Sequence, residues 1–192
     1  MDIRQSFFRN RSYTPIPLAL AIIYYANPGG ILTAVGTALI ILGELIRLNG
    51  VRYAGGATRT RKVGAPALCT DGPYAYVRNP LYLGNIVIYA GIVLFAGGEK
   101  VYLLLGLTVA FFVLQYGLII SLEEETLRGK FGDSYIRYVK SVPRLIPRFS
   151  HWSGKQQSGP SPWKKTLLTE QRSLQTLSIS IILILFWQLF SG

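Results

Sequence analysis

The sequence predicts an all-α protein, a multi-pass transmembrane helical bundle of about five spans. Half of its 192 residues are hydrophobic and only 15% are charged, against about 25% in a typical soluble domain. The charged residues lie between long uncharged stretches, which is typical of membrane spans. When these stretches are taken as spans, nineteen of the twenty Lys and Arg residues fall on one side of the membrane.

The apolar stretches are predicted to form helices in the order in which they occur. Residues 16–26 and 31–46 flank the uncharged turn "NPGG" and are expected to form a tight helical hairpin. Both are short against the roughly 20 residues of a full span, so they must tilt or extend into the interface. Residues 80–96 and 101–122 are joined only by "GGEK", and residues 174–190 form the last span.

The distribution of positive charge predicts the orientation of the bundle. The "NPGG" turn carries no Lys or Arg and the "GGEK" turn carries only Lys100. The N-terminus and both long polar segments carry all the others, and loops rich in Lys and Arg stay in the cytosol. We therefore expect a cytosolic N-terminus, two cytosolic polar segments and an outer C-terminus. Near the end of the second stretch, Glu44 and Arg47 have the spacing of an i,i+3 ion pair at the interface.

Composition divides the chain into a core, a linker and a last helix. Residues 1–150 are expected to hold four spans and the cytosolic segments. Residues 151–172 are expected to be a polar linker, because "SGKQQSGPSP" is rich in Gly, Pro and Ser and has no periodicity. Residues 173–192 are expected to form a C-terminal transmembrane helix that packs against the core or makes an oligomer contact.

Several classes of site and partner are excluded by the composition. A single Cys excludes an intramolecular disulfide, a Cys-rich zinc site and an iron–sulfur cluster, and a single His argues against a histidine-built metal site. We therefore expect no metal. The net charge of +11 does not indicate nucleic-acid binding, because the basic residues lie between apolar segments rather than among aromatics on a soluble face. The bilayer is the expected partner.

Two polar segments adjoin the cytosolic ends of spans. The first is "GPYAYVRNPLYLGN", residues 72–85, and the second is "EEETLRGKFGDSYIRYVKSVPRLIP", residues 123–147. Acidic residues at a bilayer boundary indicate function. Carboxylates and tyrosine faces hold small cations, and backbone freed by Pro and Gly can bond a ribose or an adenine ring. The two segments therefore predict one pocket at the cytosolic face, suited to a sulfonium cofactor or a choline-like amine.

The same two segments carry a family resemblance. The family signature is, roughly, Gly-x-Tyr, Arg-His-Pro-x-Tyr-x-Gly, a Glu-Glu pair, Phe-Gly-x-x-Tyr and an end like Val-Pro-Arg-x-x-Pro. Over residues 64–148 this chain resembles the integral-membrane methyltransferases that include isoprenylcysteine carboxyl methyltransferase and the phospholipid N-methyltransferases. Both halves of the signature occur in order, with a helical hairpin between them.

The resemblance implies S-adenosylmethionine as the methyl donor, bound at the cytosolic ends of the core helices. Because a pocket at the mouth of apolar helices exposes one side to lipid, we expect the acceptor to be an amphiphile that enters from the bilayer; the alternative is that the helices only anchor an enzyme for soluble substrates. Carried over position by position, the cofactor contacts are Pro66, Ala67, Leu68, Cys69, Tyr74, Asn79, Pro80, Leu81, Tyr82 and Glu123.

Two departures from the family pattern bear on the acceptor. Asn79 replaces the usual His and cannot titrate near neutral pH. Ile119 stands where the isoprenylcysteine branch has an arginine, one helical turn before the glutamate that corresponds to Glu123, and leaves nothing obvious to hold a carboxylate. We therefore expect a phospholipid headgroup amine as the acceptor, with Glu124 as the catalytic base that takes its proton. The alternative is O-methylation of a C-terminal S-isoprenylcysteine carboxylate.

Two other classes of function are alternatives to methyl transfer. Membrane sterol reductases use NADPH and carry a similar Pro-Asn-Tyr-x-Gly-Glu/Asp turn. The corresponding "PLYLGN" lacks both the Asn before Tyr and the acid after Gly. A non-enzymatic membrane protein is the other alternative. Protection from melting by adenosylmethionine, by NADPH or by neither would separate the three.

Overall fold

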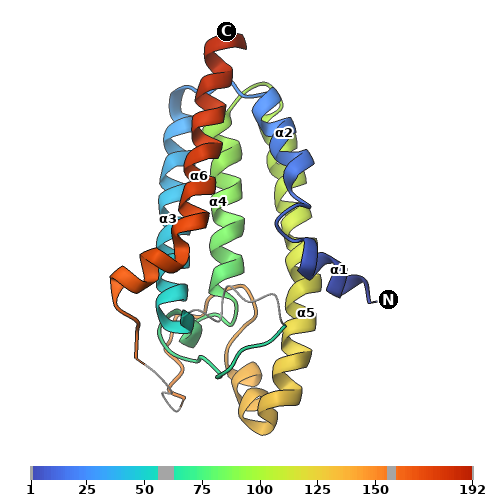
Figure 1. Ribbon diagram of the computed structural model, residues 1–192, viewed down its shortest axis with the longest axis vertical. Coiled ribbons are helices and arrows are strands. Elements are labelled where there is room, and N and C mark those ends of the chain that lie inside the picture. The colour runs from blue at the N-terminus through green and yellow to red at the C-terminus, as the bar shows by residue number, and fades with distance from the viewer. Residues whose placement is uncertain (1, 56–62, 155–158, 192) are drawn as a thin grey trace.

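A computed structural model describes residues 2–55, 63–154 and 159–191 as a bundle of helices (Figure 1). Within these ranges the chain forms no strand, and its only β-type pairing is a single bridge between Asn27 and Gly97. The prediction of an all-α bundle is thereby confirmed. The elements are α1 (Ile3–Asn10), α2 (Ile16–Tyr24), α3 (Gly30–Ala54), η2 (Gly72–Ala75), α4 (Pro80–Ala96), α5 (Val101–Ser141) and α6 (Trp163–Ser191), where η2 is a 3-10 helix.

Three of the described helices, α3, α5 and α6, are long and apolar enough to cross a membrane. The apolar helix α4 has 17 residues and is shorter. With nine residues, α2 extends over about 14 Å, well below the roughly 30 Å of a hydrocarbon core. The count of about five spans therefore stays a prediction. The second arm of the expected hairpin continues to Ala54, beyond its expected end at residue 46.

The turns expected on the outer side lie together at one end of the bundle. The backbone N–H of Asn27 donates to the carbonyl of Ala96 at 2.8 Å, which joins the "NPGG" turn to the end of α4. The described parts of both polar segments lie at the opposite end, at the bottom of Figure 1. That this end faces the cytosol stays a prediction. Arg59, Arg61, Lys62 and Lys155, which contribute to the charge argument, lie outside the described residues.

Small residues let α3 and α4 approach closely, as at many helix interfaces in membranes. A Cβ atom on Gly43 of α3 would lie 2.8 Å from the carbonyl oxygen of Gly84 on α4. A Cβ atom on Gly84 would lie 2.6 Å from Cγ of Arg47. Glycine at these two positions therefore brings Arg47 directly against the first turns of α4.

The second polar segment is helical as far as Ser141, where α5 ends. The helix is interrupted at Gly132, whose φ of 51° lies in the left-handed region that favours glycine. At this break the chain turns back, as the lower end of α5 in Figure 1 shows. Tyr135 and Tyr138 in the returning part are buried against Leu68, which fixes the loop that precedes η2.

The last helix begins earlier than expected. It starts at Trp163, so the second half of the segment 151–172 is helical and the linker is shorter than predicted. The Arg52 guanidinium lies over the Trp163 ring, with its Cζ 4.5 Å from the ring centroid. At the other end, the indole N–H of Trp187 donates to the carbonyl of Tyr24 at 3.2 Å. These contacts hold α6 along α3 and α2, so it packs against the core.

Candidate active site

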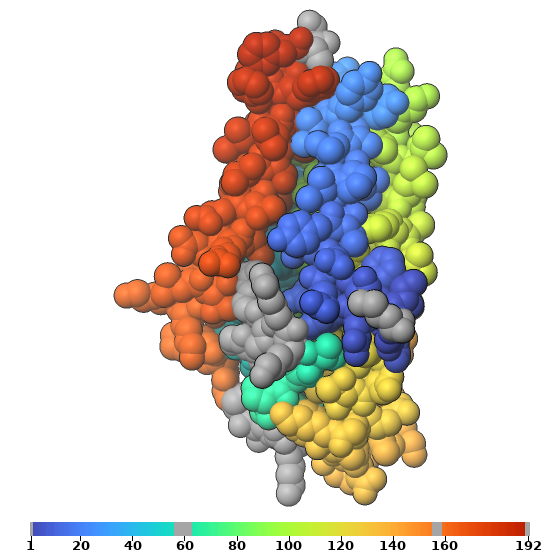
Figure 2. Space-filling view, turned by 45° about the vertical axis from the view of Figure 1, so that its right-hand side comes forward, coloured from blue at the N-terminus to red at the C-terminus, as the bar shows by residue number. Residues whose placement is uncertain are grey.

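A cavity of about 890 Å³ opens where the two polar segments meet the bundle. Its walls come from the N-terminal segment, from α3, from the loop before η2, from η2, from α4, from α5 and from α6. Figure 2 shows α6 and the N-terminal helices side by side on the face of the molecule, with a furrow between them. All ten residues to which the resemblance assigned cofactor contacts line this cavity, namely Pro66, Ala67, Leu68, Cys69, Tyr74, Asn79, Pro80, Leu81, Tyr82 and Glu123.

The loop that contributes the first four of these residues is held by the returning part of α5. Leu68 is buried against Tyr135, Tyr138 and Val142. The Tyr138 hydroxyl also donates to the carbonyl of Tyr74 at 2.7 Å. The returning part of α5, from Tyr135 of the "FGDSY" signature to Val142, thus supports the loop and η2.

Glu123 and Tyr82 form the most direct link between the two halves of the signature. The Tyr82 hydroxyl donates to Oε1 of Glu123 at 2.8 Å, from α4 to α5. Glu123 directly follows the apolar part of α5, and burial raises the pKa of its carboxyl group to about 6, although the Tyr82 hydrogen bond opposes this shift. The second carboxylate oxygen can accept a hydrogen bond from a ligand in the cavity.

Cys69 also lines the cavity but is not activated as a nucleophile. Burial raises the pKa of its thiol to about 11, so the thiol is neutral near pH 7. Burial likewise raises the pKa of the Tyr74 phenol well above its usual value. Both side chains therefore offer uncharged surface to a ligand.

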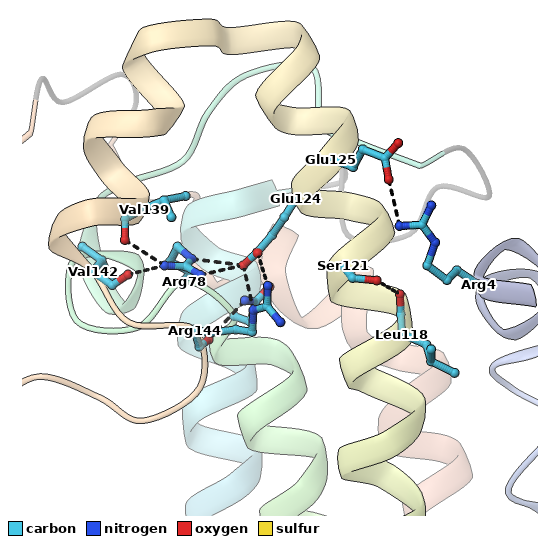
Figure 3. Close-up of polar contacts among 10 residues, drawn as sticks. Arg4, Arg78, Leu118, Ser121, Glu124, Glu125, Val139, Val142 and Arg144 are labelled. Carbon is cyan, nitrogen blue, oxygen red and sulfur yellow. Dashed lines mark hydrogen bonds and ion pairs between the residues drawn. The ribbon is translucent and has the colours of Figure 1, made fainter. Parts of the chain in front are cut away.

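Glu124, the expected catalytic base, is the centre of an ion-pair cluster (Figure 3). Its Oε1 accepts from Nη2 and Nε of Arg78 at 2.9 and 3.1 Å, and its Oε2 accepts from Nη2 of Arg144 at 2.5 Å. Only 10% of the Glu124 side chain is exposed. It does not line the cavity, although its neighbour Glu123 does. This placement favours a structural role for Glu124.

The cluster joins the "RNP" turn to the "VPR" segment. Nη1 of Arg78 donates to the carbonyls of Val139 and Val142 at 3.0 and 2.6 Å. The Asn79 side-chain amide donates to the carbonyl of Arg144 at 3.1 Å. These bonds fix the start of α4, from which Leu81 and Tyr82 reach the cavity.

The structure brings further polar side chains to the cavity that sequence reasoning did not assign to it. Among them are Arg11, from the segment between α1 and α2, and Arg47, from α3. The expected pair of Arg47 with Glu44 is present, with Nε and Oε2 4.0 Å apart. Ionisable residues inside an apolar stretch indicate function by default, and this signal could have identified Arg47 from the sequence.

These arginines correct the inference that was drawn from Ile119. Ile119 is fully buried in a cluster with Phe112 and Tyr116 and offers no polar group, as expected. The expectation that nothing obvious would hold a carboxylate overlooked two cations, because Arg11 and Arg47 line the same cavity from other parts of the chain. A position-by-position comparison along one helix cannot detect a cation that another helix contributes.

Comparison with known proteins gives a family match over residues 31–134, more than half of the chain, to the model described as phospholipid methyltransferase. Among curated proteins, the chain is similar to the protein-S-isoprenylcysteine O-methyltransferase of Schizosaccharomyces pombe. The two are 35% identical over 112 residues, which cover 56% of this chain and 46% of the relative.

Methanethiol S-methyltransferase 1 of Bradyrhizobium diazoefficiens is 32% identical over 138 residues, which cover 68% of this chain and 42% of the relative. Protein-S-isoprenylcysteine O-methyltransferase B of Arabidopsis thaliana is 29% identical over 120 residues, which cover 58% of this chain and 57% of the relative. The chain thus spans about half the length of these relatives. No solved structure matches it significantly.

Proposed function

This chain belongs to the phospholipid methyltransferase family, and on that premise we propose that it methylates the carboxylate of a membrane-embedded amphiphile of the isoprenylcysteine type, with S-adenosylmethionine as the donor. The observation that carries the proposal is the single cavity in which the signature residues and two arginines converge. The proposed orientation keeps the N-terminus and this cavity on the cytosolic side.

The residues of the cavity fit the cofactor. When bound, S-adenosylmethionine supplies a methyl group on a positively charged sulfonium. The partly buried Glu123 carboxylate can accept a hydrogen bond from a ribose hydroxyl or an amino group, and the Tyr74 ring offers an uncharged face. The backbone of residues 66–69 and the first turn of α4 complete the proposed contacts.

The contacts of Glu124 remove the base that was expected for an amine acceptor. An ammonium headgroup must lose a proton before attack, and Glu124 was expected to take it. That carboxylate is instead held by Arg78 and Arg144 outside the cavity lining. A carboxylate acceptor needs no base, because its oxygen bonds the methyl carbon as the carbon–sulfur bond breaks and the opposite charges of the two reactants disappear together.

The comparisons point the same way. Two of the reported relatives are named for O-methylation of protein S-isoprenylcysteine. Arg11 and Arg47 supply the positive charge that such an acceptor requires. These observations favour the isoprenylcysteine alternative over the phospholipid amine that the sequence alone suggested.

The chain contributes orientation and exclusion of water to the proposed reaction. Deeper in the bundle the cavity is lined by Ile88, Ile92 and Leu177, which suit an apolar tail. Charge neutralisation between two bound groups is favoured when water is excluded. An amphiphile whose tail lies among these residues keeps its polar end near the signature residues.

A thiol acceptor is the second candidate. A relative named methanethiol S-methyltransferase 1 aligns with 68% of this chain. A thiol must lose a proton, and the Glu123 carboxylate, with a pKa of about 6, lies in the cavity as a possible acceptor for that proton.

Methyl transfer from labelled S-adenosylmethionine to three acceptors tests the proposal. The purified full chain is incubated separately with N-acetyl-S-farnesylcysteine, methanethiol and phosphatidylethanolamine. We expect a base-labile methyl ester on the farnesylcysteine, and little product when Tyr82→Ala replaces the wild-type chain. Label found only in the thioether or only in the phospholipid would overturn the carboxylate proposal and identify the acceptor class.

A further inference from the structure

The last helix forms one wall of the candidate active site. The family match ends at residue 134, well before α6 begins at Trp163. Nevertheless the side of α6 between Leu168 and Ser180 lines the same cavity as the signature residues. A helix outside the matched region thus reaches the site, and its polar residues there have no counterpart in the matched part of the family.

Arg47 of α3 joins α6 to the other helices of the cavity wall. Its Nη1 donates to Oδ1 of Asn85 on α4 at 2.7 Å, and its Nη2 donates to the Ser173 hydroxyl at 3.0 Å. The same Nη2 forms an ion pair with Oε2 of Glu170. Glu170 is 1% exposed, while 15% of the Arg47 side chain is exposed. Three helices therefore converge on one guanidinium in the cavity wall.

The position of this cluster matches the polar end of an amphiphile. Asn85 follows Leu81 by four residues on α4, so the cluster lies about one helical turn, roughly 5 Å, from the proposed cofactor contacts. On its other side the lining becomes apolar at Ile88 and Ile92. A group bound by Arg47 would thus lie between the cofactor contacts and the place for an apolar tail.

We propose that Arg47, Asn85 and Ser173 form the subsite for the acceptor's carboxylate, and that Glu170 of α6 occupies this subsite until an acceptor replaces it. This inference rests on the proposed function. Glu170 presents to Arg47 the same chemical group that an isoprenylcysteine acceptor would present. Arg47 is then the specificity-determining residue, and Glu170 is a resident competitor.

The exchange selects acceptors by their charge. Removing one partner from a buried ion pair is strongly unfavourable, because it leaves an uncompensated charge. Without Glu170, Arg47 would keep only Glu44 as an acidic partner among the described residues, with the Glu44 Oε2 4.0 Å from its Nε, so Glu170 leaves most readily when another carboxylate takes its place. Glu170 lies in the second turn of α6, and this helix begins near the polar end of the bundle (Figure 1), so the released carboxylate would have only a short way to water. A neutral amphiphile of the same shape cannot drive this exchange.

Binding measurements test the subsite independently of turnover. The dissociation constants of N-acetyl-S-farnesylcysteine and its neutral carboxamide are measured on the full chain in nanodiscs, together with that of S-adenosylhomocysteine. We expect the wild type to prefer the carboxylate. Arg47→Gln should weaken carboxylate binding about 10- to 100-fold, the loss of a charge-assisted contact, and leave the carboxamide and S-adenosylhomocysteine unaffected.

Glu170→Gln distinguishes a competitor from a structural partner by the direction of the change in affinity. Removal of a resident competitor should tighten carboxylate binding, by up to about tenfold. The double variant Arg47→Gln/Glu170→Gln removes both charges of the Arg47–Glu170 pair, so that among the described residues only Glu44 loses an ion-pair partner, and it serves as the control for folding. We expect it to bind the carboxylate as poorly as Arg47→Gln alone. Recovery of carboxylate binding in the double variant, or weaker binding in Glu170→Gln, would show that the pair is only structural.

The outcome also separates this inference from the proposed function. Equal binding of carboxylate and carboxamide by the wild type would overturn the subsite even if the chain methylates another acceptor. Carboxylate-selective binding without formation of a methyl ester would overturn the proposed reaction and leave the subsite standing.

Discussion

Replacing Glu124 by Gln separates a structural role of this residue from a catalytic one. The Glu124 carboxylate accepts hydrogen bonds from two guanidinium groups and holds the "RNP" turn against the "VPR" segment. A glutamine amide keeps one oxygen acceptor, but it loses the charge and presents N–H donors to the arginines. We expect the variant to be less stable and to retain methyl transfer at temperatures where it is folded.

The magnitude of the loss follows from the burial of the two arginines. Only 9% of the Arg78 side chain is exposed, so its charge is left buried without a counter-ion, a loss of about 3 kcal/mol. The Arg144 side chain is 46% exposed, and its pair adds less than about 1 kcal/mol. For a chain of this size, about 3 kcal/mol corresponds to a fall in melting temperature of roughly 6–12 °C.

Thermal melting and single-temperature kinetics together measure these effects. Melting is followed in detergent, and kcat and the dissociation constant of S-adenosylhomocysteine are measured well below the transition. Glu125→Gln is the matched control, because Glu125 is the next residue, is 67% exposed and pairs with Arg4 at 2.8 Å on the surface. The control should melt close to the wild type. A loss of kcat of about 100-fold or more in Glu124→Gln, with unchanged melting, would refute the structural argument and restore the catalytic hypothesis.

Three further outcomes are expected. Glu123 is mostly ionised only above its raised pKa of about 6, so S-adenosylhomocysteine binding, measured by calorimetry, should weaken as the pH falls through 6. This pH dependence should vanish in Glu123→Gln, and a flat profile in the wild type would remove Glu123 from the site. Cys69 is the single cysteine and the pKa of its thiol is about 11, so roughly one thiol in a thousand is ionised at pH 8 and maleimide labelling should be slow. Bound S-adenosylhomocysteine should slow the labelling further. Rapid labelling that the ligand does not change would place Cys69 outside the bound region. In a cysteine-free background, an impermeant reagent added outside intact cells should label a cysteine introduced at Lys100 but not one introduced at Ser153, and the reverse pattern would invert the proposed topology.

The helices and the lining of the cavity could be predicted from local patterns. Apolar stretches identified α4 and the cores of α3, α5 and α6, because a membrane span must satisfy its own backbone and be apolar along its length. The signature residues converge because they sit in fixed places relative to helix ends. Leu81 and Tyr82 lie in the first turn of α4, and Glu123 directly follows the apolar part of α5.

Helix lengths were not predictable in the same way. Hydropathy falls after residue 46, but α3 continues to Ala54 because its polar end packs against the first turn of α4, where Leu81 lies beside Gly50. The polar segment after residue 122 is helical because its tyrosines are buried against the loop before η2. Packing partners far along the chain decide these boundaries.

The sequence by itself determined that the chain is a helical membrane protein with a methyltransferase signature, because hydropathy and motif spacing are properties of neighbouring residues. Only the tertiary structure decided which charges meet. Glu124 lies between Arg78 and Arg144, whose positive charges compensate its negative charge. Glu123, one residue earlier on the helix, lines the cavity. Arg47 and Glu170 are 123 residues apart and form a pair because α6 lies along α3. The role of an ionisable group depends on the charges within a few ångströms of it, and these distances are set by how the helices pack rather than by the order of the residues.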